Sequence, residues 1–483
     1  MPNSATTAPA TTAPATTAPA TTAPATAGTP APAPGGSANL LTDFYDLLPK
    51  AIERAVPDRE PLTADPAAFS PGFALPELDD RVRHFLAAAT AQWLPLGEYG
   101  GHRLTLLDLT GNPGTGTTKT FASLLIVARA VEYVRRTGEP VVIFSPTSAN
   151  KGVALRDAVL RAIDAGLVEP EQLRVVVLAP ASCRQKLRAS RLSEDDRLRA
   201  LNPLLLYGGA NPEGVKPLGR EYVDQYAPAL RRDGLNVWFS LQLGNYLTAD
   251  VARAFFEHQV DPTDATGAAP RLHAHAVSSA FGLLGYHQGR AVLEDLGLAT
   301  RSTRPASLLV QHLGTPDMVV NLRHGDFDHA HRPDYRFDPG TGLHRQTADP
   351  RFPEVTYDPD EVLDPTFYTR RPITSPAMNE LIATFGGDGV VVSLAECVAR
   401  YPALRVLLGG DRLPADLRTL REWSLVMALT GVCNAIDRGL VEEGRDIVVH
   451  GSGCYSTADY EPMAAGAMTP VHTVEDVARA VSG

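Results

Sequence analysis

Lysine is scarce in this sequence. Only five of the 483 residues are lysine, so the basic surface is made almost wholly of arginine; the five are Lys50, Lys119, Lys151, Lys186 and Lys216. A lysine amine can lose its proton when it is desolvated and can form a Schiff base, and an arginine guanidinium can do neither. Lys119, which follows a Gly/Pro/Thr-rich turn, is therefore the first candidate for a catalytic residue.

Cysteine, net positive charge and long apolar runs are also lacking. The four cysteines are scattered without C-x-x-C spacing, which is typical of a reduced, intracellular protein. No stretch of about 18 apolar residues occurs, and the N-terminus lacks the charged and apolar regions of a signal peptide. The net charge of -11 and the isoelectric point near 5.6 argue against nucleic acid or an anionic membrane as the partner. These absences predict a cytoplasmic protein.

Composition divides the chain into three parts. Residues 1–36 repeat T-T-A-P-A four times before a Pro/Gly/Ser stretch, which predicts a disordered arm. Residues 37–100 place apolar side chains at helical spacing, so we expect a helical N-terminal region. Residues 101–483 form the main body, in which 324–369, rich in Asp, Pro, His and Arg, is expected to be an irregular surface insertion.

From residue 101 onward, short apolar runs alternate with segments of helix length. This alternation predicts an α/β fold built on parallel sheets. The runs of strand length are 141–145, 175–178, 236–241, 273–277, 307–310, 390–393 and 447–450.

Four turns that follow apolar runs carry the polar residues of interest. The first, 111–118 (GNPGTGTT), leads into a helix expected to begin with Lys119. The second, 145–152 (SPTSANKG), places Asn150 31 residues after Lys119. The third is 278–285 (SSAFGLLG), and the fourth is 450–457 (HGSGCYST).

Together these turns resemble those of the fold type II pyridoxal-phosphate enzymes, which include threonine synthase, cysteine synthase and the β subunit of tryptophan synthase. The corresponding family motifs are N-P-T-G-S-F-K-D-R, S-S-G-N-x-G/A, a glycine-rich phosphate turn and D-S-G-x-x-x-S-T. The resemblance covers about 350 residues, from Leu104 to Thr457. It implies two parallel-sheet α/β domains with the active site between them, pyridoxal 5′-phosphate as cofactor, and a homodimer.

The resemblance also implies the roles of the first two turns. Lys119 would form the Schiff base with the cofactor and then remove the proton from the substrate Cα. Thr147, Ser148 and Ala149 would bind the substrate carboxylate through backbone N–H groups. Asn150 would donate to the 3′-hydroxyl of the cofactor ring.

The other two turns would hold the phosphate and the ring nitrogen. Backbone N–H groups and the positive end of a helix bind a phosphate dianion, and the residues at this place are Ser278, Ser279, Ala280, Phe281 and Gly282. Ser452 would hydrogen-bond the pyridine nitrogen. A neutral hydroxyl at that nitrogen goes, in the family, with elimination and replacement at Cβ or Cγ.

Alternatives stay open at each turn. Lys151 is a rival for the Schiff base, although its place after Asn150 suits a surface position in the first turn of a helix. Residues 145–150 also suit an ordinary helix N-cap. Residues 243–250 are a rival phosphate turn, and His450 is a rival for the ring nitrogen. Departures from the family motifs, such as Thr118 where phenylalanine is usual, indicate a divergent branch.

The leading hypothesis is a pyridoxal-phosphate-dependent lyase or synthase acting on an amino acid by β- or γ-elimination or replacement. A second is a P-loop-like nucleotide hydrolase, since 111–116 followed by Lys-Thr is similar to G-x-x-x-x-G-K-[ST], although two threonines displace the lysine. A third is a non-catalytic binding protein that keeps the fold. The His/Asp cluster at 324–331 has metal-ligand chemistry, but its Arg- and Pro-containing surroundings favour a solvated loop, so we predict no metal site.

Overall fold

The computed structural model describes residues 35–55, 69–240, 243–262 and 270–482. The predicted arm, residues 1–36, lies outside these residues except at its end, where strand β1 (Gly36–Asn39) begins. Within the described ranges no helix combines the length and apolarity needed to span a bilayer.

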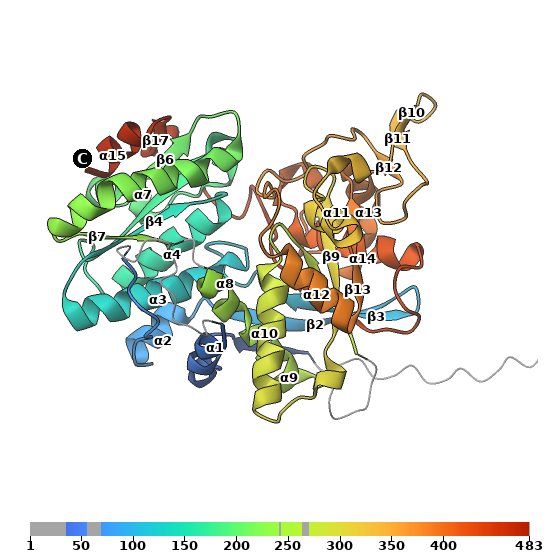
Figure 1. The fold of residues 1–483 in the computed structure, drawn as a ribbon, viewed down its shortest axis with the longest axis horizontal. Helices are drawn as coiled ribbons and strands as arrows, with labels where there is room; N and C mark the ends of the chain where they lie inside the picture. Colours follow the sequence, from blue (N-terminus) through green and yellow to red (C-terminus); the bar gives the residue numbers. More distant parts are fainter. Residues whose placement is uncertain (1–34, 56–68, 241–242, 263–269, 483) are drawn as a thin grey trace, which may run out of the picture. The chain divides into compact units, whose positions relative to one another are not determined.

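Two sheets organise the chain (Figure 1). The first has seven strands, whose spatial order is β1, β2 (Thr90–Tyr99), β3 (His102–Asp108), β15 (Ile447–Gly451), β8 (Leu272–Ala276), β9 (Ala306–His312) and β13 (Gly387–Val392). The last five strands in this order are parallel to one another. The second is wholly parallel; its order is β17 (Met468–Val471), β6 (Leu204–Tyr207), β5 (Leu173–Pro180), β4 (Val141–Pro146) and β7 (Asn236–Phe239). The predicted α/β fold built on parallel sheets is confirmed.

Helices connect the strands, and two small antiparallel sheets accompany them. The helices are α1 (Leu48–Ala55), α2 (Asp80–Leu86), α3 (Lys119–Thr137), α4 (Asn150–Asp164), α5 (Arg191–Glu194), α6 (Asp196–Leu201), α7 (Val215–Arg232), α8 (Leu243–Asp250), α9 (Ala252–Val260), α10 (Phe281–Asp295), α11 (Asp317–His324), α12 (Ser375–Phe385), α13 (Leu394–Leu407), α14 (Ser424–Asp437) and α15 (Val474–Ser482). The small sheets are β10 (Arg336–Asp338), β11 (Leu343–Arg345) and β12 (Val355–Thr356), and β14 (Leu420–Glu422) with β16 (Tyr455–Ser456).

Period-two alternation explains how the five-stranded sheet is covered. In β4, Val141 and Ile143 join the core formed with α3 and α4, whereas Val142 and Phe144 join the core formed with α7. Because successive side chains of a strand point to opposite faces, a strand that is apolar at every position must be buried on both. Figure 1 shows α7 on one face of this sheet.

The same alternation gives the seven-stranded sheet one apolar face and one partly polar face. Ile447 and Val449 of β15 pack in the core with α13 and α14. His450 of β15 and His273 and His275 of β8 occupy the other face, where they are buried. The polar face therefore places titratable groups beneath the turns that end these strands.

The N-terminal region is not purely helical. Residues 37–100 contain α1 and α2 as expected, but also β1 and β2, which add two antiparallel strands to the large sheet. In β2, Ala91 and Trp93 are buried and Gln92 is exposed, an alternation typical of a strand. Pro95 lies where the ladder is interrupted, because the pairing with β1 ends at Trp93 and the pairing with β3 shifts register between Pro95 and Gly97.

The insertion at 324–369 is a surface excursion only in its first part. Strands β10 and β11 are largely exposed, but Asp364 is fully buried, and Leu363, Thr366 and Phe367 are nearly so. The polar side chains of this segment therefore find protein partners, and its last part belongs to the core.

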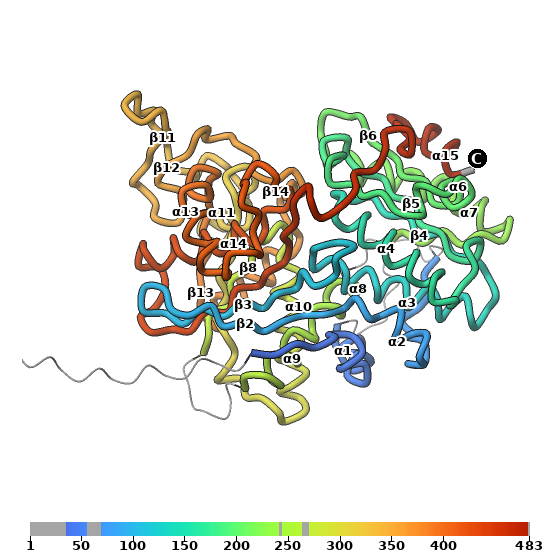
Figure 2. The backbone as a smooth tube through the Cα atoms, turned by 180° about the vertical axis from the view of Figure 1, so that it is seen from behind, coloured from blue at the N-terminus to red at the C-terminus, as the bar shows by residue number. Residues whose placement is uncertain are grey.

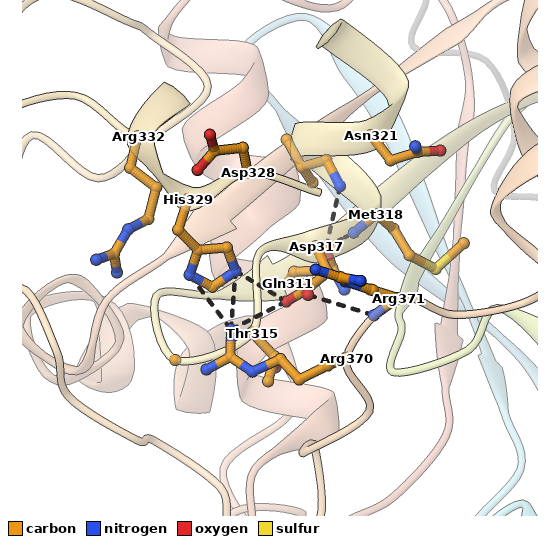
Figure 3. A network of polar contacts seen from close by, with 12 residues as sticks. Gln311, Thr315, Asp317, Met318, Asn321, Asp328, His329, Arg332, Arg370 and Arg371 are labelled. Carbon is orange, nitrogen blue, oxygen red and sulfur yellow. Dashed lines mark hydrogen bonds and ion pairs between the residues drawn. The ribbon is translucent and has the colours of Figure 1, made fainter. Parts of the chain in front are cut away.

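A polar network anchors the insertion (Figure 3). The buried carboxylate of Asp317, at the start of α11, accepts from Arg370 Nη1 at 3.2 Å and lies 3.3 Å from His329 Nε2. Farther along, Thr374 Oγ1 donates to the carbonyl of Ser279 at 2.7 Å. The residues after the insertion thereby contact the third turn predicted from sequence.

Candidate functional site

Lys119 stands at the start of α3, directly after β3 and its turn. Its side chain is partly exposed and forms no hydrogen bond or ion pair with any described residue. Burial lowers the pKa of its amine, the nearby Asp250 carboxylate opposes this shift, and the Arg253 guanidinium adds to it. The result is an unbonded amine with an enhanced neutral fraction, as a nucleophile or base requires.

The turn before Lys119 does not offer a phosphate cradle. Its amides are already used: Gly114 N–H donates to Asn112 Oδ1, those of Thr115 and Gly116 donate to the Asn112 carbonyl, and that of Thr118 donates to the Ser452 carbonyl. A P-loop needs these N–H groups free to hold phosphate. The P-loop-like alternative is therefore not supported.

The second turn leaves donors free where the carboxylate-binding role was predicted. The N–H groups of Ser148 and Ala149 donate to no described residue, whereas the N–H of Thr147 is taken by the carbonyl of Leu178 at 2.8 Å. Ala149 has φ of 66°, a left-handed conformation rare for a residue with a Cβ. This conformation begins α4 without a side-chain N-cap, so the turn is not an ordinary capped helix start.

Asn150 is held more firmly than the sequence indicated. Its Nδ2 donates to Glu422 Oε2 at 2.6 Å, and its Oδ1 accepts from Tyr455 Oη at 2.7 Å. One amide hydrogen and one lone pair remain. The amide plane is therefore fixed before any ligand arrives.

Lys151 is buried, which corrects the expectation of a surface position. Its Nζ donates to the carbonyl and hydroxyl of Ser240 at 3.1 and 3.3 Å and lies 4.7 Å from the centre of the Tyr246 ring. Burial, and to a lesser degree the charge of Lys119, lower the pKa of Lys151 to about 7. Two lysines with lowered pKa values thus lie close enough to influence one another.

Replacing Lys151 with methionine is expected to change how stability depends on pH. Between about pH 7 and the ordinary lysine value of 10.5, the unfolded chain binds a proton here that the folded chain does not, so the free energy of unfolding rises with pH. Lys151→Met removes this rise, which amounts to at most a few kcal/mol at about 1.4 kcal/mol per pH unit. Below pH 7 the variant should be the more stable protein.

Urea denaturation at several pH values across that window measures the difference. Lys50→Met is the control, because Lys50 is exposed and its loss should leave the pH dependence unchanged. If Lys151→Met also leaves it unchanged, the amine of Lys151 does not titrate in that window.

The third turn presents free amides at the start of α10. The N–H groups of Ser278, Ser279 and Ala280 make no hydrogen bond to the described part of the chain. Ala280 adopts the left-handed region, and Phe281 stacks on Tyr246 with 5.0 Å between ring centres. A Cβ on Gly282 would lie 2.5 Å from Arg253 Nη1, so only glycine lets this guanidinium approach the helix end.

The rival phosphate turn, residues 243–250, is helix α8. Its Asp250 carboxylate accepts from Arg253 Nη2 at 2.5 Å, and the same nitrogen donates to Thr118 Oγ1 at 2.7 Å. α8 therefore supports the turn before Lys119 through Arg253 instead of forming a strand-end turn.

Ser452, in the fourth turn, is the better placed of the two candidates for the ring nitrogen. Its hydroxyl has no hydrogen bond with a described residue, and its carbonyl accepts from Thr118 N–H at 2.8 Å, which places it beside Lys119. His450 is fully buried with both ring nitrogens engaged: Nδ1 lies 3.1 Å from Arg253 Nη1, and Nε2 lies 2.9 Å from His273 Nδ1.

These contacts determine which atoms donate and which accept in a buried chain of hydrogen bonds. Arg253 can only donate, so His450 Nδ1 accepts and its Nε2–H donates to His273. His273 Nε2 then faces Glu257 at 3.4 Å. Burial would raise the pKa of Glu257, but His273 and Arg271 lower it below its usual range. Burial and neighbouring cations keep the pKa of His450 well below its ordinary value, so the imidazole stays neutral.

Sequence reasoning missed a second buried cluster, around Lys186. Its Nζ donates to Asp364 Oδ1 and Oδ2 at 2.8 and 2.7 Å and to Glu422 Oε2 at 2.8 Å. Glu422 in turn holds Asn150 and raises the pKa of Lys119. The low number of lysines was the only signal in the sequence that could have pointed to it.

These residues fit pyridoxal phosphate. Lys119 provides an unbonded amine, the free amides of 278–280 and the positive end of α10 suit a phosphate dianion, and the buried Arg253 guanidinium adds positive charge beside Gly282. The Ser452 hydroxyl is available for a ring nitrogen.

Fold and site define an α/β protein in which turns at the carboxyl ends of parallel strands converge on one unbonded lysine. The chain belongs to a family of unknown function, DUF6002, whose model matches residues 36–483. No curated protein matches it in sequence.

Several solved structures are similar in fold. The PLP-bound threonine synthase of Brucella melitensis has a TM-score of 0.48 and 13% identity, over 91% of this chain and 86% of that one. Yeast threonine synthase has a TM-score of 0.48 and 10% identity, over 84% and 75%. The L-serine ammonia-lyase of Rhizomucor miehei has a TM-score of 0.45 and 14% identity, over 75% and 93%. At such identities, and with a family description that names no activity, the function is argued from the residues themselves.

Proposed function

We propose that this protein is a pyridoxal-phosphate-dependent lyase or synthase that acts on an amino acid by elimination or replacement at Cβ or Cγ. The observation that carries the proposal is the unbonded Lys119 amine, whose pKa is lowered by burial, together with three unused amides at the start of α10. The unbonded Lys119 amine argues against a non-catalytic binding protein, because such a protein would have no need of a reactive amine.

The cofactor would be held by groups from three turns. Its phosphate would accept from the amides of Ser278, Ser279 and Ala280, its ring nitrogen would face the Ser452 hydroxyl, and the remaining amide hydrogen of Asn150 would reach its 3′-hydroxyl. When bound, pyridoxal phosphate supplies an electron-withdrawing ring that acidifies the Cα–H bond of an attached amino acid.

The substrate carboxylate would bind the free amides of Ser148 and Ala149. Lys119, whose lowered pKa increases the neutral fraction of its amine, would then take the Cα proton and could return one later. A neutral hydroxyl from Ser452 moderates electron withdrawal, which favours expulsion of a group from Cβ or Cγ over transfer of the amino group. A leaving group such as phosphate, acetate or water suits this chemistry.

Deuterium exchange tests the reaction type. The protein, loaded with pyridoxal phosphate, is incubated in deuterated water with serine, threonine, O-acetylserine, O-phosphoserine or O-phosphohomoserine. We expect exchange at Cα together with loss of the side-chain group for at least one of them. Stoichiometric conversion of the cofactor to its amine form without elimination would identify an aminotransferase and contradict the proposal.

A further inference from the structure

A cavity of about 240 Å³ lies against the turn that precedes Lys119. It is bounded by α4, by Pro113 and Gly114, by residues 188–190 and by residues 459–463. Figure 2 shows the C-terminal chain passing from the neighbourhood of β14 toward β6 and α15. The volume is somewhat below the roughly 300–1,000 Å³ of most small-molecule pockets, so only a small ligand fits.

Two buried guanidinium groups line this cavity without a carboxylate partner. Arg156 and Arg188 are 4% and 8% exposed, and neither forms an ion pair with a described residue. Arg156 Nη1 donates to the Asn202 carbonyl at 2.5 Å, but its Nη2 donates to nothing in the described ranges, and the buried Nε atoms of both arginines have no acceptor. The carboxylates of Asp459 and Asp157 act on Arg188, which also lies over the rings of Tyr455 and Tyr460. Arg156 has no such counter-charge among the described residues. Because a buried cation without a counter-charge is costly, Arg156 favours an anionic group.

The mouth of the cavity has the opposite charge. Asp459 and Glu461 line it and are exposed, and Asp157 lines it in a half-buried position. A simple anion would be repelled by these carboxylates on entering. A zwitterion with its carboxylate inward and its ammonium outward would satisfy both.

The remaining wall is apolar, because it includes Val153, Leu160, Leu204 and Met463. We propose that the cavity binds a free α-amino acid with a small apolar side chain: the carboxylate on Arg156, the ammonium at Asp459 and Glu461, and the side chain on the apolar wall.

A ligand bound in this cavity would affect Lys119 through the turn that precedes it. Arg188 donates to the carbonyls of Pro113 and Thr115 at 2.9 and 2.8 Å, and Asp157 accepts from Asn112 at 2.9 Å. Both wall residues therefore hold the turn that precedes Lys119. If the proposed function is correct, the bound amino acid regulates that reaction; binding itself does not depend on it.

Isothermal titration calorimetry of the full-length protein tests the site, with L-valine, L-leucine and L-methionine as probes. We expect at least one to bind, and L-leucinamide and N-acetyl-L-leucine, which each lack one charge, to bind at least tenfold more weakly than L-leucine. Arg156→Met should weaken binding at least tenfold. Lys119→Ala should not, which separates this site from the one around Lys119.

A second variant and a hydrogen-exchange measurement test the site independently of Arg156→Met. Glu461→Gln alters an exposed side chain and should weaken binding severalfold even if Arg156→Met fails to fold. Hydrogen exchange should show protection of residues 112–118 and 153–160 on binding. The proposal is overturned if none of the three amino acids binds, if N-acetyl-L-leucine binds as well as L-leucine, or if Glu461→Gln and Arg156→Met both bind normally. If no amino acid shows Cα exchange with loss of its side-chain group, but the calorimetric titration shows the expected binding, only the proposed function is contradicted.

Discussion

Lys119→Ala is expected to abolish the covalent attachment of pyridoxal phosphate and to reduce turnover by at least the 10²–10⁴-fold that a general base contributes. Because Lys119 bonds to no described residue, its loss should leave the free energy of unfolding within about 1 kcal/mol of the parent. Borohydride reduction followed by peptide mapping gives the readout, since it should place the pyridoxyl group on Lys119 in the parent protein.

Lys50→Ala and Lys151→Ala are the matched controls. The first removes an exposed lysine and should change neither labelling nor turnover. The second removes the neighbouring buried amine and should keep the label on Lys119. A pyridoxyl group found on Lys151 in the parent would show that the assignment of the Schiff-base lysine is wrong.

Lys186→Met is expected to be the most destabilising single change discussed here. It would leave two carboxylates, Asp364 and Glu422, whose side chains are 0% and 1% exposed, without their shared cation. Removing one partner of a buried pair costs roughly 3–5 kcal/mol, and the loss should appear in urea denaturation.

Arg418→Met provides the comparison. Its partner is Asp416, and the two side chains are 89% and 46% exposed, so water screens the pair and its loss should cost far less than the loss of Lys186. Equal losses in the two variants would mean that the Lys186 cluster is not the buried, unscreened group described above. Because Glu422 also holds Asn150, Lys186→Met should in addition weaken cofactor binding.

Local patterns predicted most of the parallel strands and the four turns that follow strands. Residues 141–144 and 447–449 are continuous apolar runs, so they could be assigned to buried parallel strands without knowledge of their neighbours. The turns at their ends carry the residues that form the candidate site, because parallel strands bring their carboxyl ends to one edge of a sheet. The assignment of Lys119 to a strand-to-helix turn needed only this local information.

The environments of those residues were decided by the tertiary structure. Lys151 has the sequence context of an exposed first-turn residue, yet the Ser240 carbonyl and the Tyr246 ring enclose it. Lys186, Asp364 and Glu422 are far apart in the chain and meet only when the last part of the insertion folds into the core. Sequence alone could propose which amine reacts, because that depends on local motif and residue type. Burial and charge pairing, which set the pKa values and the stability of the site, depend on contacts between distant segments and so on the fold.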